Sequence, residues 1–225
     1  MICAATEFFN STPFLLTVNP GMLMSQEMLW MPGASTVGVV CMDGVILASE
    51  KRLTMGYMVT SRVGRKVFRI TDHVGTACAG LVSDMQMLTK EIAALARLYE
   101  LNIGRAISVK SAAKIMSNIL FERRLFPLFT QTIVGGVDET GPSLYVLDLL
   151  GSLIEDKFAT VGTGSEVAIG VLEAGYREGL SLSEAKDLVV KAIRSAIARD
   201  AASGDGIDVM TITKAGVGEE TLPAK

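Results

Sequence analysis

Short apolar runs separated by turn residues follow one another along the chain from residue 36. Residues 36–42 and 45–49 are rich in β-branched and apolar side chains, and Asp43-Gly44 between them is a two-residue turn signal, so they predict a β-hairpin. The same pattern predicts further strands at residues 66–70, 75–82, 130–137, 143–149, 153–161 and 207–213.

Longer segments between these strands repeat apolar residues every three or four positions, the period of an amphipathic helix. The first spans residues 85–102, with Asp84 as its expected N-cap and Gly104 just past its end. The second spans residues 108–126 and is expected to end at Pro127. Two more helices are expected at residues 167–178 and after the capping box Ser181–Glu184, through residue 197.

The order of these elements predicts the fold class. Strands and helices come in blocks, as strands, two helices, strands, two helices and a last strand. The strands are apolar on both faces, so each sheet needs cover on two sides. A single layered α+β domain, with stacked sheets and helices outside, fits this order better than a doubly wound sheet does.

Composition excludes several classes of function. The chain has 225 residues, with 21 Lys plus Arg and 24 Asp plus Glu and a net charge of −3, which excludes a strongly basic nucleic-acid binder. Three widely spaced cysteines and one histidine, His73, make a disulfide framework or a metal site unexpected, and the usual triads would need His73. No cofactor motif is present, and no apolar run is long enough to cross a membrane.

The first 33 residues differ from the rest. They contain no Lys or Arg, and they hold the only tryptophan, Trp30, together with three of the six prolines. A secretory signal would need a positive N-terminal region. We therefore expect an extended apolar leader outside the packed domain, with a misassigned start as the alternative.

Several short segments together resemble the β subunit of an archaeal-type proteasome core. They match in order from about Gly33 to Lys214, and they are Ser35-Thr-Val-Gly-Val-Val, Asp43 to Arg52, Gly64-Arg-Lys-Val67, Ala79 to Asp84, the double glycine of residues 128–136, Gly162-Thr-Gly-Ser165, Gly170-Val-Leu-Glu173 and Arg199 to Val209. The resemblance implies the four-layer αββα sandwich of the N-terminal-nucleophile hydrolases. It also implies a propeptide at residues 1–33, cleaved after Gly33, and a hydrolase domain at residues 34–225.

The resemblance implies a threonine endopeptidase that needs no histidine. In this family a threonine hydroxyl at the mature N-terminus is the nucleophile, and its free α-amine can act as the base, because an α-amino group titrates near pH ~8. Lys66 matches the lysine that favours loss of the hydroxyl proton, and Glu50 matches its acidic partner. Asp200 and Ser203 match the residues that position the amine, and Thr163 stands where the family usually has serine.

Substrate contacts carry over in the same way. Thr54 and Gly80 match positions whose backbone pairs with an extended substrate strand. Leu53, Cys78 and Val82 match the wall and floor of the adjacent pocket, although ordinary core packing explains them equally well. If they line a pocket, its uncharged character predicts cleavage after apolar residues by an enzyme with an intact nucleophile.

One departure from the family pattern decides what this chain can do. The pattern is a glycine, a run of threonines and then Val-Gly, whereas this chain reads Gly33-Ala-Ser-Thr-Val-Gly38. The nucleophile position therefore holds Ala34, which has no hydroxyl. We interpret the chain as an engineered Thr→Ala form that keeps its leader as a trapped precursor, in preference to a naturally inactive structural subunit.

The resemblance also implies partners and a location. These are proteasome α subunits and other β subunits in stacked heptameric rings, a regulatory ATPase acting through the α ring, unfolded polypeptide as substrate, and the cytoplasm. An α subunit would carry an extra N-terminal helix, and a subunit of a related bacterial two-ring protease stays a further alternative.

Overall fold

The computed structural model describes residues 33–225. The predicted leader, apart from Gly33, lies outside the described residues. The strands are β1 (Thr36–Cys41), β2 (Gly44–Glu50), β3 (Leu53–Met55), β4 (Met58–Ser61), β5 (Val67–Arg69), β6 (Val74–Gly80), β7 (Thr130–Asp138), β8 (Gly141–Leu147), β9 (Ile154–Asp156), β10 (Phe158–Val161), β11 (Ile207–Thr213) and β12 (Gly216–Leu222). The helices are α2 (Val82–Ile103), α3 (Val109–Glu122), α4 (Ser165–Gly175) and α5 (Leu182–Ile197).

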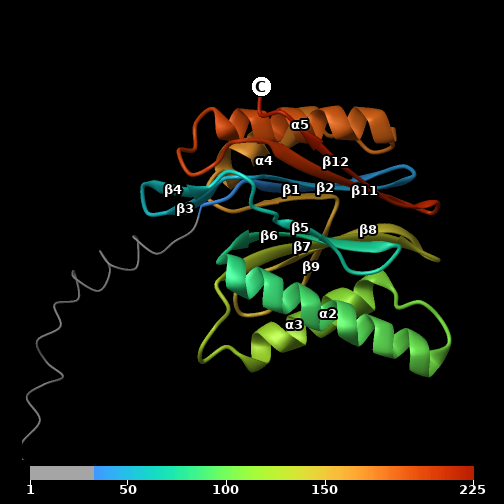
Figure 1. The fold of residues 1–225 in the computed structure, drawn as a ribbon. Helices are drawn as coiled ribbons and strands as arrows, with labels where there is room; N and C mark the ends of the chain where they lie inside the picture. Colours follow the sequence, from blue (N-terminus) through green and yellow to red (C-terminus); the bar gives the residue numbers. More distant parts are fainter. Residues whose placement is uncertain (1–32) are drawn as a thin grey trace, which may run out of the picture.

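These elements form four layers (Figure 1). Two five-stranded antiparallel sheets, in the orders β10-β1-β2-β11-β12 and β5-β6-β7-β8-β9, lie face to face. Helices α4 and α5 cover the outer face of the first sheet, and α2 and α3 cover the outer face of the second. The predicted αββα sandwich is therefore confirmed.

Each layer boundary has its own apolar core. Between the sheets, Leu47 on β2 and Met210 on β11 pack in one cluster with Ile133 on β7 and Leu144 on β8. Separate clusters lie under α4 and α5 and under α2 and α3. Strands β1 and β2 are buried along their whole length, because they lie in the middle of a sheet that is covered on both faces.

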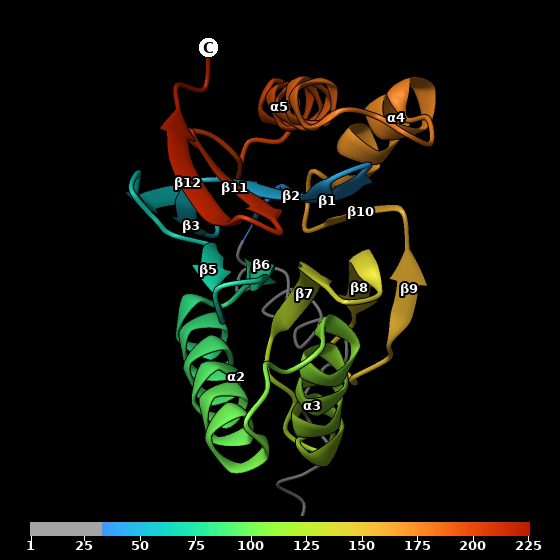
Figure 2. The same ribbon diagram turned by 90° about the vertical axis from the view of Figure 1, so that its right-hand side faces the viewer.

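The run at residues 153–161, predicted as one strand, is two strands in different sheets. Strand β9 pairs with β8, and β10 pairs with β1, so the chain crosses from one sheet to the other at Lys157. Figure 2 shows β9 and β10 on the same flank of the molecule. The apolar pattern cannot reveal the crossing, because only Lys157 separates the two strands in sequence.

Other local predictions were also wrong. Asp84 does not cap α2: the N-cap is Leu81, and the Asp84 carboxylate instead accepts the backbone N–H of Phe129 at 2.9 Å. Helix α3 ends at Glu122, before Pro127, in a turn closed by the Phe126 N–H and the Arg123 carbonyl. Strands β3, β4 and β12 were not predicted, because each is short or largely exposed and lacks an apolar face.

Candidate active site

Ala34 lies two residues before the start of β1 and is fully buried. Its backbone is held from the Gly162–Ser165 turn: the Ala34 N–H donates to Thr163 Oγ1 at 3.2 Å, and the Ala34 carbonyl accepts the Gly164 N–H at 3.2 Å. Gly162 has a φ of 98°, and a Cβ there would lie 2.3 Å from the Ala34 carbonyl oxygen. Glycine at position 162 therefore permits a close approach of two backbones.

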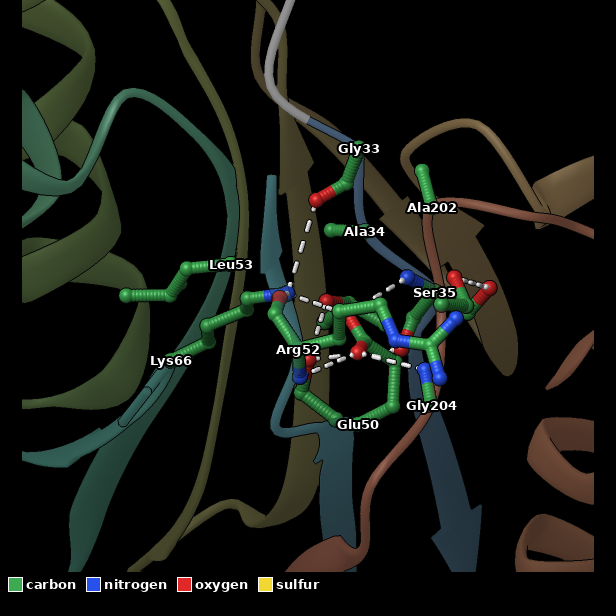
Figure 3. A network of polar contacts seen from close by, with 12 residues as sticks. Gly33, Ala34, Ser35, Glu50, Arg52, Leu53, Lys66, Ala202 and Gly204 are labelled. Atoms are coloured by element: carbon green, nitrogen blue, oxygen red, sulfur yellow. Dashed lines mark hydrogen bonds and ion pairs between the residues drawn. The ribbon is translucent and has the colours of Figure 1, made fainter. Parts of the chain in front are cut away.

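Lys66 and Glu50 form a buried ion pair beside Ala34 (Figure 3). The two side chains are 1% and 0% exposed. The Lys66 ammonium also donates to the Arg52 carbonyl at 2.7 Å and to the Gly33 carbonyl at 3.4 Å. Its charge therefore faces the peptide bond that joins Gly33 to Ala34.

The environment of this pair disfavours both charges. Burial raises the pKa of Glu50 and lowers the pKa of Lys66, because each charge loses water, and the attraction between the two groups opposes both shifts. Backbone donors compensate the carboxylate: Glu50 Oε2 accepts the N–H groups of Arg52 at 2.7 Å and Gly204 at 3.0 Å. The sequence thus builds a specific electrostatic site at the end of β2.

A second polar network surrounds the Ala34 nitrogen. Asp200 Oδ2 accepts hydrogen bonds from the hydroxyls of Thr163 and Ser203, each at 2.6 Å. The Ser35 hydroxyl lies 2.7 Å from Ser203 Oγ, and it donates there because the Ser203 proton is already directed at Asp200. The structure thus brings Thr163, Asp200 and Ser203, which are distant from Ala34 in sequence, close to Ala34.

Neither hydroxyl that follows Ala34 can replace a side-chain hydroxyl at position 34. Ser35 is engaged with Ser203, and the Thr36 hydroxyl bonds to Ser49 Oγ at 2.8 Å and to the Cys78 carbonyl at 3.1 Å. Each hydroxyl is buried and has its own partners. The side chain that faces the Lys66 region is the methyl group of Ala34 (Figure 3).

The candidate substrate residues lie in several environments. Thr54 Oγ1 accepts the Gly33 N–H at 3.4 Å, so it contacts the chain that leads into Ala34. Gly80, with φ 141°, could not carry a Cβ, which would lie 2.0 Å from the Phe129 carbonyl oxygen. Leu53 and Val82 are partly exposed.

Cys78 is fully buried, and burial raises the pKa of its thiol to about 11. Its sulfur lies 3.7 Å from the Thr76 hydroxyl. The neighbouring residues Ala77 and Ala79 pack instead in the cluster between the sheets that contains Ala34. Since side chains alternate along a strand, Cys78 points to the face of β6 opposite that cluster, and its place in a substrate pocket stays a prediction.

Sequence reasoning missed the residues that hold the ion pair from outside. Arg52 contacts both members of the pair through its backbone, and the Arg52 side chain bonds to Asp205 Oδ2 at 2.8 Å. The spacing of Arg52 two residues after Glu50 was visible in the sequence. No sequence signal placed the turn at Gly204 and Asp205 against them.

The αββα sandwich, with these polar residues gathered at the start of β1, defines the class of the N-terminal-nucleophile hydrolases. Comparison with known proteins then identifies the family. The family model for the proteasome subunit matches residues 31–212, and the chain belongs to the proteasome subunit family.

Curated relatives are archaeal β subunits. Proteasome subunit beta 1 of Cenarchaeum symbiosum is 51% identical over 84% of this chain and 97% of its own length. Proteasome subunit beta 1 of Nitrosopumilus maritimus is 49% identical, and proteasome subunit beta 2 of Caldivirga maquilingensis is 46% identical, each over 88% of this chain and 99% of its own length. Proteasome β subunits are threonine peptidases that assemble with α subunits into a core particle.

Residues 33–225 contain neither a membrane-spanning helix nor a cluster of metal-binding side chains. No helix there is long and apolar enough to cross a membrane. Within the same range, no group of three or more His, Cys, Asp or Glu side chains is placed to hold a metal ion.

Proposed function

We propose that this chain is a β subunit of the proteasome core particle that supplies no nucleophile of its own. Residues 1–33 remain attached to it as an uncleaved propeptide, and residues 34–225 form the hydrolase domain. The observation that carries the proposal is the position of Ala34, whose methyl group lies where the two polar networks meet.

The chemistry of a hydroxyl at position 34 follows from these contacts. The Lys66 ammonium would favour the deprotonated hydroxyl electrostatically and would polarise the Gly33 carbonyl, 3.4 Å away. Attack on that carbonyl would form an ester between Gly33 and the position-34 oxygen as the peptide bond between residues 33 and 34 breaks and its nitrogen takes up the hydroxyl proton. Water would then hydrolyse the ester, which releases the leader with a Gly33 carboxylate and restores the hydroxyl beside a free α-amine. Thr163, Asp200 and Ser203 would then orient that amine as the base for peptide cleavage.

Both functional groups are missing from the chain as it stands. Alanine has no hydroxyl to attack Gly33, and its nitrogen is tied up in an amide bond and is not basic. The chain therefore neither cleaves its leader nor hydrolyses peptides. Its function is to form part of the ring and the chamber wall, together with α subunits and other β subunits.

The substrate and the remaining partners belong to the same proposal. Unfolded polypeptide reaches the chamber through the α ring, where a regulatory ATPase delivers it, in the cytoplasm. An extended segment pairs with the backbone at Thr54 and Gly80, and Leu53, Cys78 and Val82 line the pocket beside position 34. The contact of Thr54 with the Gly33 N–H supports this path for the chain.

A second candidate is a subunit whose role was always structural. The observation that favours it is that the site is complete without a nucleophile: in the described part of the chain, every buried side-chain nitrogen and oxygen has a hydrogen-bond partner. The two candidates differ in whether the site can still act once a hydroxyl is supplied.

Ala34→Thr, co-expressed with an α subunit, tests both candidates. Ala34→Val is the matched control, since valine has the shape of threonine without its hydroxyl. Intact-mass measurement should show loss of residues 1–33 in the threonine variant alone, and that variant should hydrolyse peptides after apolar residues. An assembled threonine variant that keeps its leader and has no peptidase activity would establish the structural candidate.

A further inference from the structure

Asp205 occupies a strained position next to the candidate active site. Among the described residues it is the only one other than glycine with a positive φ, at 68°. Its side chain is only 11% exposed, and its two oxygens contact Arg52 Nε at 2.8 Å and Arg62 Nη1 at 3.4 Å. A non-glycine residue persists in this backbone region when its surroundings impose it. The contacts with Arg52 and Arg62 are surroundings of this kind.

Arg52 connects Asp205 to the buried ion pair. Its guanidinium packs directly over Gly204, where a Cβ would lie 2.4 Å from Nη2, and it donates to the Ala201 carbonyl at 2.9 Å. Its backbone meanwhile donates to Glu50 and accepts from Lys66, each at 2.7 Å. The side chain of Arg52 is thus fixed on the Ala201–Asp205 turn. Its main chain meanwhile contacts both Glu50 and Lys66, which lie beside it in Figure 3.

We propose that Asp205 is a positioning residue that acts through Arg52 to hold the Lys66 ammonium at position 34. The catalytic meaning of this assignment rests on the proposed function, whereas the placement of Lys66 can be tested in the chain as it stands. The competing explanation is that Asp205 only closes the turn that leads into β11.

The charges of the ion pair between Asp205 and Arg52 support the assignment. The hydrogen bond with Asp205 raises the pKa of Arg52, and the same bond lowers the pKa of Asp205, so the pair stays ionised at neutral pH. Besides Glu50, the Lys66 ammonium bonds to the carbonyl oxygens of Gly33 and Arg52. The other charges that act on it are Asp200 and the Arg52 guanidinium. A shift of the Arg52 backbone would therefore remove a large part of what solvates the Lys66 ammonium.

The first experiment measures how accessible Lys66 is. The protein is pulsed with an amine-acylating reagent at several pH values, and acylation at each lysine is quantified by peptide mass spectrometry. In Asp205→Asn, which tolerates positive φ but lacks the charge, acylation of Lys66 should be roughly tenfold faster, the factor expected for one hydrogen bond to a charged group. Lys186, paired with Glu220 at 2.5 Å away from this turn, is the internal reference and should not change.

Two further variants distinguish a role of the Asp205–Arg52 ion pair in holding Lys66 from a role of Asp205 in closing the turn. Glu219→Gln removes the carboxylate of the exposed Arg65–Glu219 pair and should leave Lys66 protected. Asp205→Gly removes the carboxylate that pairs with Arg52, and glycine adopts the positive φ without strain. We expect it to expose Lys66 at least as much as Asp205→Asn does. Protection of Lys66 in Asp205→Gly equal to that in the parent would overturn the proposal and assign Asp205 to the turn.

The Ala34→Thr background tests the catalytic consequence. There Asp205→Asn should lower kcat roughly 10- to 100-fold, as expected for a small displacement of a reacting group, and should shift the pH–rate profile while KM changes little. An unchanged profile in an active enzyme would refute the assignment. If Ala34→Thr is itself inactive, the proposed precursor function fails, and the acylation of Lys66 still decides the role of Asp205.

Discussion

The candidate active site and the exposed apolar surfaces of the same domain follow opposite rules. At the site, Glu50, Lys66 and Ser203 are buried, and their polar atoms have partners within the chain. On the β3–β4 hairpin, the hairpin surface of Met55, Tyr57 and Met58 is exposed, with Tyr57 fully accessible. At the C-terminal end of α3, the α3-end surface of Phe121, Leu125 and Phe126 is also exposed.

This difference distinguishes features that one chain forms by itself from features that serve contacts with other subunits. The site depends on contacts within one chain, so it stays assembled whether or not a nucleophile is present. Large exposed apolar side chains gathered on one surface, by contrast, are typical of protein contact sites. A β subunit that supplies no nucleophile would still need both surfaces to take its place among other subunits.

Removal of Lys66 should have the largest effect on the stability of the isolated chain. Lys66→Ala leaves Glu50 as an uncompensated buried carboxylate, and breaking such a pair costs about 3–5 kcal/mol. Thermal and denaturant unfolding measure the loss. Arg97→Ala, which breaks an exposed pair with Glu100, is the control and should change stability by less than about 0.5 kcal/mol.

A double variant tests whether the lost stability comes from the unpaired charge. Lys66→Met with Glu50→Gln removes both charges and keeps most of the volume, so it should be more stable than Lys66→Ala. Melting of Lys66→Ala at the parent temperature would instead mean that Glu50 carries no unpaired charge in that variant, and it would weaken the catalytic assignment of both residues.

Much of the fold was predictable because its signals are local. The hairpin of β1 and β2 follows from two apolar runs around Asp43-Gly44, and α5 begins at the predicted capping box of Ser181 and Glu184. The crossing at Lys157 was not predictable, because it depends on which two sheet edges share a flank. The pairing of β12 with β11 likewise stabilises a strand that has no apolar pattern of its own.

The candidate site likewise has residues that the sequence could identify and one that it could not. Glu50, Lys66, Asp200 and Ser203 were found through a family resemblance, and the structure brings them together around Ala34. Their catalytic roles stay predictions. Asp205 was not found, because its importance lies in a backbone conformation and in a contact across 153 residues of sequence, which neither periodicity nor a motif encodes.

The capping box of α5 should give a smaller effect that depends on pH. Hydrogen bonds from the Ser181 hydroxyl and backbone N–H lower the pKa of Glu184. A lowered pKa means that the carboxylate stabilises the folded state above its unfolded pKa of about 4.3, and this contribution is lost as pH falls through the folded value. Glu184→Gln should therefore melt slightly below the parent at pH 7.

The same comparison at acidic pH checks the sign. The difference between Glu184→Gln and the parent should shrink as pH falls below the unfolded pKa of about 4.3, and it should disappear below the lowered folded pKa of Glu184, where both side chains are uncharged. Glu178→Gln, at an exposed glutamate just before the capping box, is the control. A difference that grows as pH falls would exclude the capping box as its cause.

Substitutions in the two apolar surfaces should have the smallest effect on the isolated chain and a clear effect on assembly. Tyr57→Ser and Phe126→Ser replace side chains that are 103% and 88% exposed, so little packing is lost and the melting temperature should hardly change. With an α subunit, light scattering should show less of the large particle for both variants, because the contacts between subunits lose buried apolar area. Tyr57→Phe and Phe126→Leu, which stay apolar, should assemble like the parent. Full assembly of both serine variants would show that neither surface lies at a subunit contact, and the contrast with the buried site would then have another cause.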